Sequence, residues 1–164
     1  MPHDGGTTES VAQGLEVKFR KLSRRDLDAV MGIESASAPD AWSRKTFWGK
    51  LNDPLVRGVV LEVEGEARGF SVCSSEGLSC HLLNIAIHPE WRRKGLGTLA
   101  IRDLEDFARK RTLIEIFFEV RESNLPAQML YKKLGYEAVE ILRSHYGNDD
   151  AYLMRKLIHL EDQL

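Results

Sequence analysis

The 164-residue sequence contains little cysteine and no long apolar run. Its two cysteines, Cys73 and Cys80, are too few for a disulfide-stapled scaffold and lack the spacing of metal ligands. No apolar stretch approaches the roughly 20 residues that a membrane-spanning helix needs. Residues 1–14 also lack the apolar centre of a secretory signal. We therefore expect a soluble, cytoplasmic protein that does not act at a membrane.

The sequence has no excess of charge of one sign. Its 23 Lys and Arg residues against 25 Asp and Glu residues leave a net charge of -2. Such a chain has no global field that would attract nucleic acid, so we expect no nucleic-acid partner, and any anion must be recognised by a local patch. The length predicts one domain. We expect residues 1–14 to form a tail outside the fold and residues 15–164 to form that domain.

Hydrophobic periodicity and turn residues predict the order β-α-α-β-β-β-α-β-α-β-β. The predicted strands are Glu16–Arg20, Val56–Val63, Ala67–Ser74, Leu78–Ile87, Leu113–Val120, Tyr136–Arg143 and Ala151–Ile158. The predicted helices begin after the capping residues Ser23, Ser43 and Asn124 and at Leu96. Cys73 and Cys80 fall within strands, where we expect small core residues.

The most informative segment is Arg92–Thr98, between a predicted strand and a predicted helix. Gly95 and Gly97 free the main chain to bend closely around an anion, and the helix that follows adds its positive end. The segment is not a Walker A loop, which requires Gly-Lys-Ser/Thr, nor a dinucleotide fingerprint, because its third glycine is missing. A pyrophosphate site and a plain glycine turn with a basic flank both remain open on these residues alone.

Two motifs resemble one known family. Arg92-Arg93-Lys94-Gly95-Leu96-Gly97, preceded by the segment Leu83–Pro89, resembles the Arg/Gln-x-x-Gly-x-Gly/Ala acetyl-CoA loop of the GCN5-related N-acetyltransferases (GNAT). Glu119-Val120-Arg121, followed by Asn124, Ala127, Leu130-Tyr131 and Gly135-Tyr136, resembles the signature of the RimI-type ribosomal-protein-alanine N-acetyltransferases within that family. The resemblance extends from about Glu16 to Leu157. It implies an α/β fold with a mixed, mostly antiparallel sheet of about seven strands flanked by about four helices.

The resemblance also implies an activity. It predicts acetyl transfer from acetyl-CoA to the N-terminal α-amine of a protein, with a ribosomal protein as one candidate, by direct attack in a ternary complex and without a metal. Three alternatives stay open: transfer to a lysine side chain, transfer to a small amine, and a non-catalytic acyl-CoA-binding module. The presence of both Glu119 and Tyr131 argues against the last of these.

By the same resemblance, Glu119 is the general base and Tyr131 the general acid. Glu119 lies near the end of an otherwise apolar strand, where desolvation would raise its pKa. The structural alternative is an ion pair with Arg121 or Arg143. Tyr131 could protonate the departing thiolate of CoA, and its alternative is a packed helix tyrosine.

The resemblance further assigns the binding residues. The main chain of Ile85, Ala86 and Ile87 is expected to bind the pantetheine arm, and Asn124 is either a cofactor contact or a helix cap. Trp42, in the loop Asp40–Ser43, and Tyr146 are expected to bind the acceptor peptide between them. The pyrophosphate is assigned to Arg93, Lys94, Gly95, Leu96, Gly97 and Thr98.

The acceptor loops also depart from the family pattern. Asp40-Ala41 replaces the usual small or apolar residue and proline, and His145 replaces a tyrosine. The acids of the loop Gly147–Asp150 either attract a cationic N-terminus or form a solvated turn.

Overall fold

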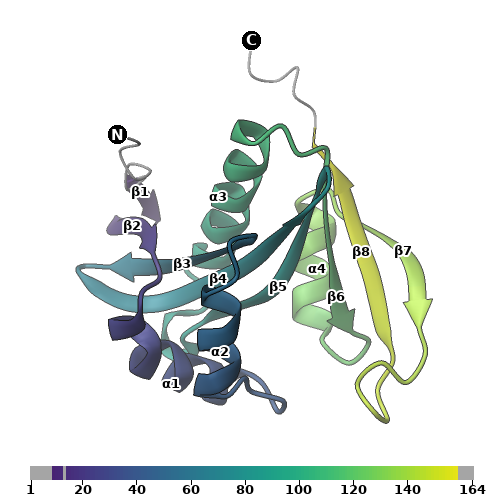
Figure 1. Cartoon of the computed structure of the whole chain (residues 1–164), viewed down its shortest axis with the longest axis horizontal. Coiled ribbons are helices and arrows are strands. Elements are labelled where there is room, and N and C mark those ends of the chain that lie inside the picture. The colour runs from purple at the N-terminus through teal and green to yellow at the C-terminus, as the bar shows by residue number, and fades with distance from the viewer. Residues whose placement is uncertain (1–8, 13, 159–164) are drawn as a thin grey trace. The chain divides into compact units, whose positions relative to one another are not determined.

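The computed structural model describes residues 9–12 and 14–158 (Figure 1). Its strands are β1 (Glu9–Ala12), β2 (Leu15–Lys21), β3 (Val56–Val63), β4 (Glu66–Glu76), β5 (Ser79–Ile87), β6 (Glu115–Arg121), β7 (Glu137–Leu142) and β8 (Ala151–Leu157). Its α-helices are α1 (Leu27–Ser37), α2 (Arg44–Leu51), α3 (Leu96–Lys110) and α4 (Leu125–Lys133), and single 3-10 turns, η1 (Arg24–Asp26) and η2 (Pro89–Trp91), precede α1 and α3. The predicted α/β order and the mixed, mostly antiparallel sheet are confirmed.

Strand β1 is the one described strand that the sequence did not predict. Its residues 9–12 were placed in a tail outside the fold, but they pair antiparallel with β2, with Glu9 opposite Lys18 and Ala12 opposite Leu15. Gly14, also part of that expected tail, lies in the turn to β2. Residues 1–8 and 13 lie outside the described residues. A strand of four residues is too short to show the apolar alternation on which sequence-based strand prediction depends.

The chain forms two compact units, Met1–Ser74 with Leu83–Leu104 and Ser75–Leu82 with Glu105–Leu164. Strand β5 and helix α3 each begin in one unit and end in the other. One domain over residues 15–164 therefore stays a prediction, and each unit is described by itself.

In the first unit, helices cover both faces of the antiparallel strands β2, β3 and β4 (Figure 1). Side chains alternate between the faces, as the pleat of a strand requires. Leu61 and Val63 of β3 pack with Leu96 at the start of α3. Val60, the neighbour of Leu61 in the chain, packs on the other side with Val30 of α1 and Phe47 of α2. This explains why β3 reads as a nearly continuous apolar run.

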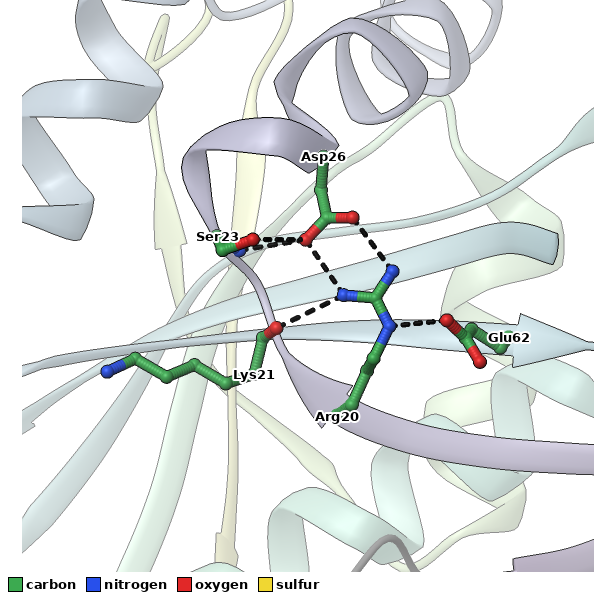
Figure 2. A network of polar contacts seen from close by, with 5 residues as sticks. All are labelled: Arg20, Lys21, Ser23, Asp26 and Glu62. Atoms are coloured by element: carbon green, nitrogen blue, oxygen red, sulfur yellow. Dashed lines mark hydrogen bonds and ion pairs between the residues drawn. The ribbon is translucent and has the colours of Figure 1, made fainter. Parts of the chain in front are cut away.

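A polar network fixes the beginning of α1 (Figure 2). Arg20 donates two hydrogen bonds of 2.8 Å to the carboxylate of Asp26 and a third, from Nε, to Glu62. The main-chain N–H of Ser23 also donates to Asp26. Burial alone would raise the pKa of Asp26, but the hydrogen bonds from Arg20 and Ser23 outweigh it and hold that pKa below its ordinary value. The network thus ties β2 and β3 to α1.

In the second unit, β6 lies between β5, which runs parallel to it, and β8, which runs antiparallel. β7 pairs with the other side of β8. Ile116, Phe118 and Val120 of β6 point to a buried face, where the ring of Tyr131 from α4 lies 4.4 Å from that of Phe118. Glu115, Phe117 and Glu119 point to the opposite face by alternation.

Cys73 and Cys80 are buried in the core, as predicted. Within residues 14–158, none of the helices is long and apolar enough to cross a membrane.

Candidate active site

The Arg92–Thr98 loop, in the first unit, has the bent main chain expected of an anion site. Arg93 and Gly95 both have positive φ angles, 62° and 79°. Arg93 is a departure that the sequence could not indicate, because positive φ is uncommon outside glycine. The bend leads into the first turn of α3, whose opening amides have no carbonyl partner within a helix. The geometry fits a pyrophosphate, and the individual contacts predicted from Arg93 to Thr98 stay predictions.

Two cations lie near Trp91, just before this loop. The guanidinium of Arg68 lies 4.9 Å from the centre of the Trp91 ring, and Nζ of Lys94 lies 5.9 Å from it. Cation–π attraction of this kind holds a long side chain in place. Lys94 is therefore restrained within the loop that the sequence assigns to the anion.

Arg92 connects the loop to β5. Its Nε donates to the main-chain oxygen of Ile87 at 3.2 Å, and its Nη2 donates to Oγ of Ser37 at 3.0 Å. The sequence placed Arg92 in the motif without a contact of its own. The structure gives it one, to the strand on which the pantetheine arm is predicted to bind.

The side chains of Ile85, Ala86 and Ile87 are fixed on both sides of β5. Ile85 and Ile87 pack against the cluster that contains Leu61, and Ala86 packs against the cluster that contains Phe47. The main chain is therefore held at a defined position by packing. Its binding of pantetheine stays a prediction.

Glu119, in the second unit, is hydrogen-bonded to a histidine that sequence reasoning missed. Nε2 of His81, on β5, lies 2.9 Å from Oε2 and 3.1 Å from Oε1 of Glu119. The parallel register places His81 beside Phe117, and the two rings stack with centroids 4.3 Å apart. Glu119 is two residues further along β6 on the same face, which brings its carboxylate to the imidazole.

This contact overturns the predicted pKa shift of Glu119. Burial does raise the pKa, as expected, but the hydrogen bond and the charge of His81 outweigh it, so the pKa of Glu119 lies below its ordinary value. The hydrogen bond to Glu119 raises the pKa of His81 in turn. The predicted alternative, an ion pair with Arg121 or Arg143, is also wrong. Glu119 contacts His81, and the two arginines pair with the acids of the β7–β8 loop.

Tyr131 lies against the opposite face of β6 from Glu119. Its side chain is 7% exposed, and burial raises the pKa of its phenol to about 12. The phenol is therefore protonated at neutral pH and can act only as a proton donor there. On the same helix, Oδ1 of Asn124 accepts a hydrogen bond of 3.2 Å from the main-chain N–H of Ala127. The predicted cap is thus present, while the roles of both residues in the reaction stay predictions.

The loop between β7 and β8 holds Tyr146 in a defined place. The guanidinium of Arg121 lies 4.1 Å from the centre of the Tyr146 ring and 3.5 Å from the carboxylate of Asp149. Asp149 also accepts from Ser123 Oγ, and Asp150 accepts from Arg143. Both loop acids are thus engaged within the protein, which favours the structured turn over a site for a cationic N-terminus.

Trp42, in the first unit, is partly buried. Its ring meets that of Phe47 edge-on at 5.1 Å, next to the buried cluster of α1, α2 and β3. Ser43 caps α2, as predicted, because its side chain accepts from the main-chain N–H of Thr46. The peptide contacts predicted for Trp42 and Tyr146 stay predictions.

Within the described residues, no group of three or more His, Cys, Asp or Glu side chains is placed to hold a metal ion. The side-chain chemistry found here is that of a carboxylate, an imidazole and a phenol, which can move protons.

Comparisons with known proteins agree with these features. Residues 27–136 match the model of the acetyltransferase (GNAT) family. The chain is 32% identical over 137 residues to the ribosomal protein bS18-alanine N-acetyltransferase of Salmonella typhimurium, covering 81% of this chain and 92% of that protein. It is 31% identical over 156 residues to an N-alpha-acetyltransferase of Sulfurisphaera tokodaii, covering 87% and 93%.

The fold agrees as well. The crystal structure of the ribosomal-protein-S18-alanine N-acetyltransferase from Escherichia coli superposes with a TM-score of 0.81 at 30% identity, covering 87% of this chain and 94% of that one. The chain therefore belongs to the acetyltransferase (GNAT) family and is an acetyl-CoA-dependent N-acetyltransferase.

Proposed function

We propose that this enzyme acetylates the α-amine at the N-terminus of a protein, with a ribosomal protein as one candidate. Two relatives that act on such amines by name, at 31% and 32% identity, support this proposal. The observation that carries it is the Glu119–His81 pair. A carboxylate whose pKa is lowered by its partner is a weak base, and the amine that it deprotonates must be correspondingly acidic.

An α-amine meets that requirement better than a lysine does. Free α-amines have pKa values of about 7.7–8.0, against about 10.4 for lysine, and this gap corresponds to roughly 3.5 kcal/mol more free energy to expose the lysine lone pair. A polyamine would in addition call for a free acidic cluster, but Asp149 and Asp150 of the β7–β8 loop are already paired with Arg121 and Arg143.

The reaction then divides among few residues. Acetyl-CoA supplies the thioester carbonyl, which the acceptor nitrogen attacks directly, so that a C–N bond forms and the C–S bond breaks. Glu119 and His81 act as one titrating unit and take the proton that the amine loses. Tyr131, which burial keeps protonated, gives its proton to the sulfur that leaves.

Thiol release from acetyl-CoA tests the proposal with three acceptors. The first is a peptide that begins with alanine, the second is the same peptide with its α-amine blocked and an internal lysine free, and the third is spermidine. We expect turnover with the first alone. Comparable turnover of the blocked peptide would assign the enzyme to lysine, and turnover of spermidine alone would assign it to small amines. Binding of acetyl-CoA without turnover of any acceptor would favour the non-catalytic module.

A further inference from the structure

Glu34 is a buried acid that the reaction above does not use. It lies in the last turns of α1 and is 2% exposed, beside Ile33, which belongs to the apolar cluster around Phe47 and Phe70. Burial raises its pKa, against the opposing effect of its hydrogen bonds. A carboxyl group in such surroundings is costly unless its oxygens are satisfied.

Two donors satisfy it, and they come from two different segments of the first unit. Nδ2 of Asn84 donates to Oε2 of Glu34. A main-chain hydrogen bond from Trp42 also acts on this carboxylate and lowers its pKa, against the effect of burial. Asn84 directly precedes Ile85–Ile87, where acetyl-CoA is predicted to bind. Trp42 carries the ring that is predicted to contact the acceptor peptide. One buried side chain thus connects the two segments.

The end of α1 also holds β5 at a second point. Ser37, three residues after Glu34, accepts from Arg92, which donates to the main-chain oxygen of Ile87. Two contacts therefore tie the stretch Ile85–Ile87 to α1. Asn84, just before this stretch, contacts Glu34, and Arg92 connects the main-chain oxygen of Ile87 to Ser37. The Trp42 loop follows α1 directly and is tied to it through Glu34.

From this geometry we infer that Glu34 is a positioning residue, which fixes the Trp42 loop against the strand predicted to carry acetyl-CoA and so sets the enzyme's efficiency toward its acceptor. This inference rests on the proposed function in one respect, namely that the acceptor is a peptide bound at Trp42. If Glu34 had only a structural role, replacing it would lower the stability of the enzyme and leave its kinetics unchanged.

The first unit offers a matched control for that distinction. Asp26, just before α1, is also buried, at 6% exposed, and accepts from Arg20 and Ser23 (Figure 2). Asp26→Asn and Glu34→Gln make the same chemical change at opposite ends of one helix. Each replaces a carboxylate oxygen by an N–H2 group that faces a donor, so both should lower the melting temperature.

The two variants should differ in kinetics at 25 °C, where both are folded. For Glu34→Gln we expect kcat/KM for the alanine-starting peptide to fall about tenfold or more, with KM for acetyl-CoA within about twofold of wild type. For Asp26→Asn both parameters should stay within about twofold. Asn84→Ala, which breaks the link from the other side, should reproduce the loss in kcat/KM if Glu34→Gln is too unstable to assay. Unchanged peptide kinetics in Glu34→Gln, or equal losses in the two variants, would overturn the inference.

A fluorescence measurement separates this inference from the choice of acceptor. Replacing Trp48 and Trp91 by phenylalanine leaves Trp42 as the only one of the three tryptophans. Glu34→Gln in that background should increase quenching of Trp42 by acrylamide, whereas Asp26→Asn should not. Unchanged quenching would contradict the inference even if the peptide is acetylated. If wild-type enzyme acetylates spermidine and no peptide, the proposed function fails instead, and increased quenching together with a loss of spermidine kcat/KM would still support Glu34.

Discussion

The two units of this enzyme differ in which parts of the chain carry their candidate functional features. In the first unit, the features predicted to hold acetyl-CoA are main-chain features: the positive φ angles of Arg93 and Gly95, the first turn of α3 and the strand Ile85–Ile87. In the second, the candidate proton-transfer groups are the side chains of Glu119, His81 and Tyr131. Binding of acetyl-CoA is therefore expected to depend on the conformation of the main chain, and proton transfer on particular side chains.

The difference predicts how each region responds to substitution. A main-chain site tolerates changes of side chain but not changes of backbone conformation. A proton-transfer site depends on single polar atoms, so that the loss of one oxygen or nitrogen should change the rate while donor binding is unchanged. The following variants test this contrast, beginning with the largest expected effect.

Glu119→Gln should lower kcat by about 10²–10⁴-fold, the usual range for loss of a general base, with KM for acetyl-CoA nearly unchanged. Steady-state kinetics with the alanine-starting peptide measure both constants. Glu115→Gln is the matched control, because Glu115 lies on the same face of β6 and pairs with Arg155 at 2.6 Å. Similar losses of kcat in the two variants would mean that Glu119 acts through the stability of the strand.

Tyr131→Phe should lower kcat by about 10²-fold, because the variant keeps the buried ring and loses only the proton donor. Tyr136→Phe serves for comparison: its ring packs on the same Phe118, at 5.1 Å, and its buried hydroxyl has no hydrogen-bond partner among the described residues. We expect normal turnover and equal or higher thermal stability for Tyr136→Phe. Full activity of Tyr131→Phe would show that another group protonates the thiolate.

Gly95→Ala should raise KM for acetyl-CoA about tenfold and leave kcat at saturating donor unchanged. An alanine at a φ of 79° costs about 1–2 kcal/mol, and the main chain relieves that strain by leaving the anion-binding conformation. Gly65→Ala introduces the same strain in the β3–β4 turn, at a φ of 84°. Its KM for acetyl-CoA should stay normal, and equal increases in both variants would argue against a main-chain site.

His81→Asn should shift the acid limb of the pH profile of kcat/KM to higher pH. The maximal value of kcat/KM, on the plateau of that profile, should change less. In wild type the hydrogen bond and charge of His81 hold the pKa of Glu119 low, so Glu119 stays ionised as the pH falls. Without His81, burial remains and raises that pKa, so the base is protonated, and activity lost, at a higher pH. A pH–rate profile of each enzyme measures the limb. An unchanged limb would mean that the pair does not titrate as a unit.

The same contrast explains which features the sequence could predict. Local patterns indicate the features that depend on residues close together in the chain. These are the Arg92–Thr98 loop, the caps Ser43 and Asn124, and seven of the strands. The contact of His81 with Glu119 joins residues 38 apart and depends on the parallel register of β5 and β6. No local pattern reveals that register, so the sign of the Glu119 pKa shift was wrong although the residue itself was singled out.

Glu34 escaped prediction for a related reason. In the sequence it continues the spacing of Leu27, Val30 and Met31 along a helix, and nothing nearby marks it as the acceptor for Asn84, 50 residues later. Strand β1 was missed because it is only four residues long. In each case the missing information was the pairing of distant segments.

The central claim, that the acceptor is an α-amine matched to a weak base, has one direct test. A single peptide that begins with alanine and contains one internal lysine is incubated with the enzyme and acetyl-CoA at neutral pH, and tandem mass spectrometry locates the acetyl group. We expect it on the N-terminal alanine, with the lysine unmodified. An acetyl group on the lysine, with the α-amine left free, would contradict the account.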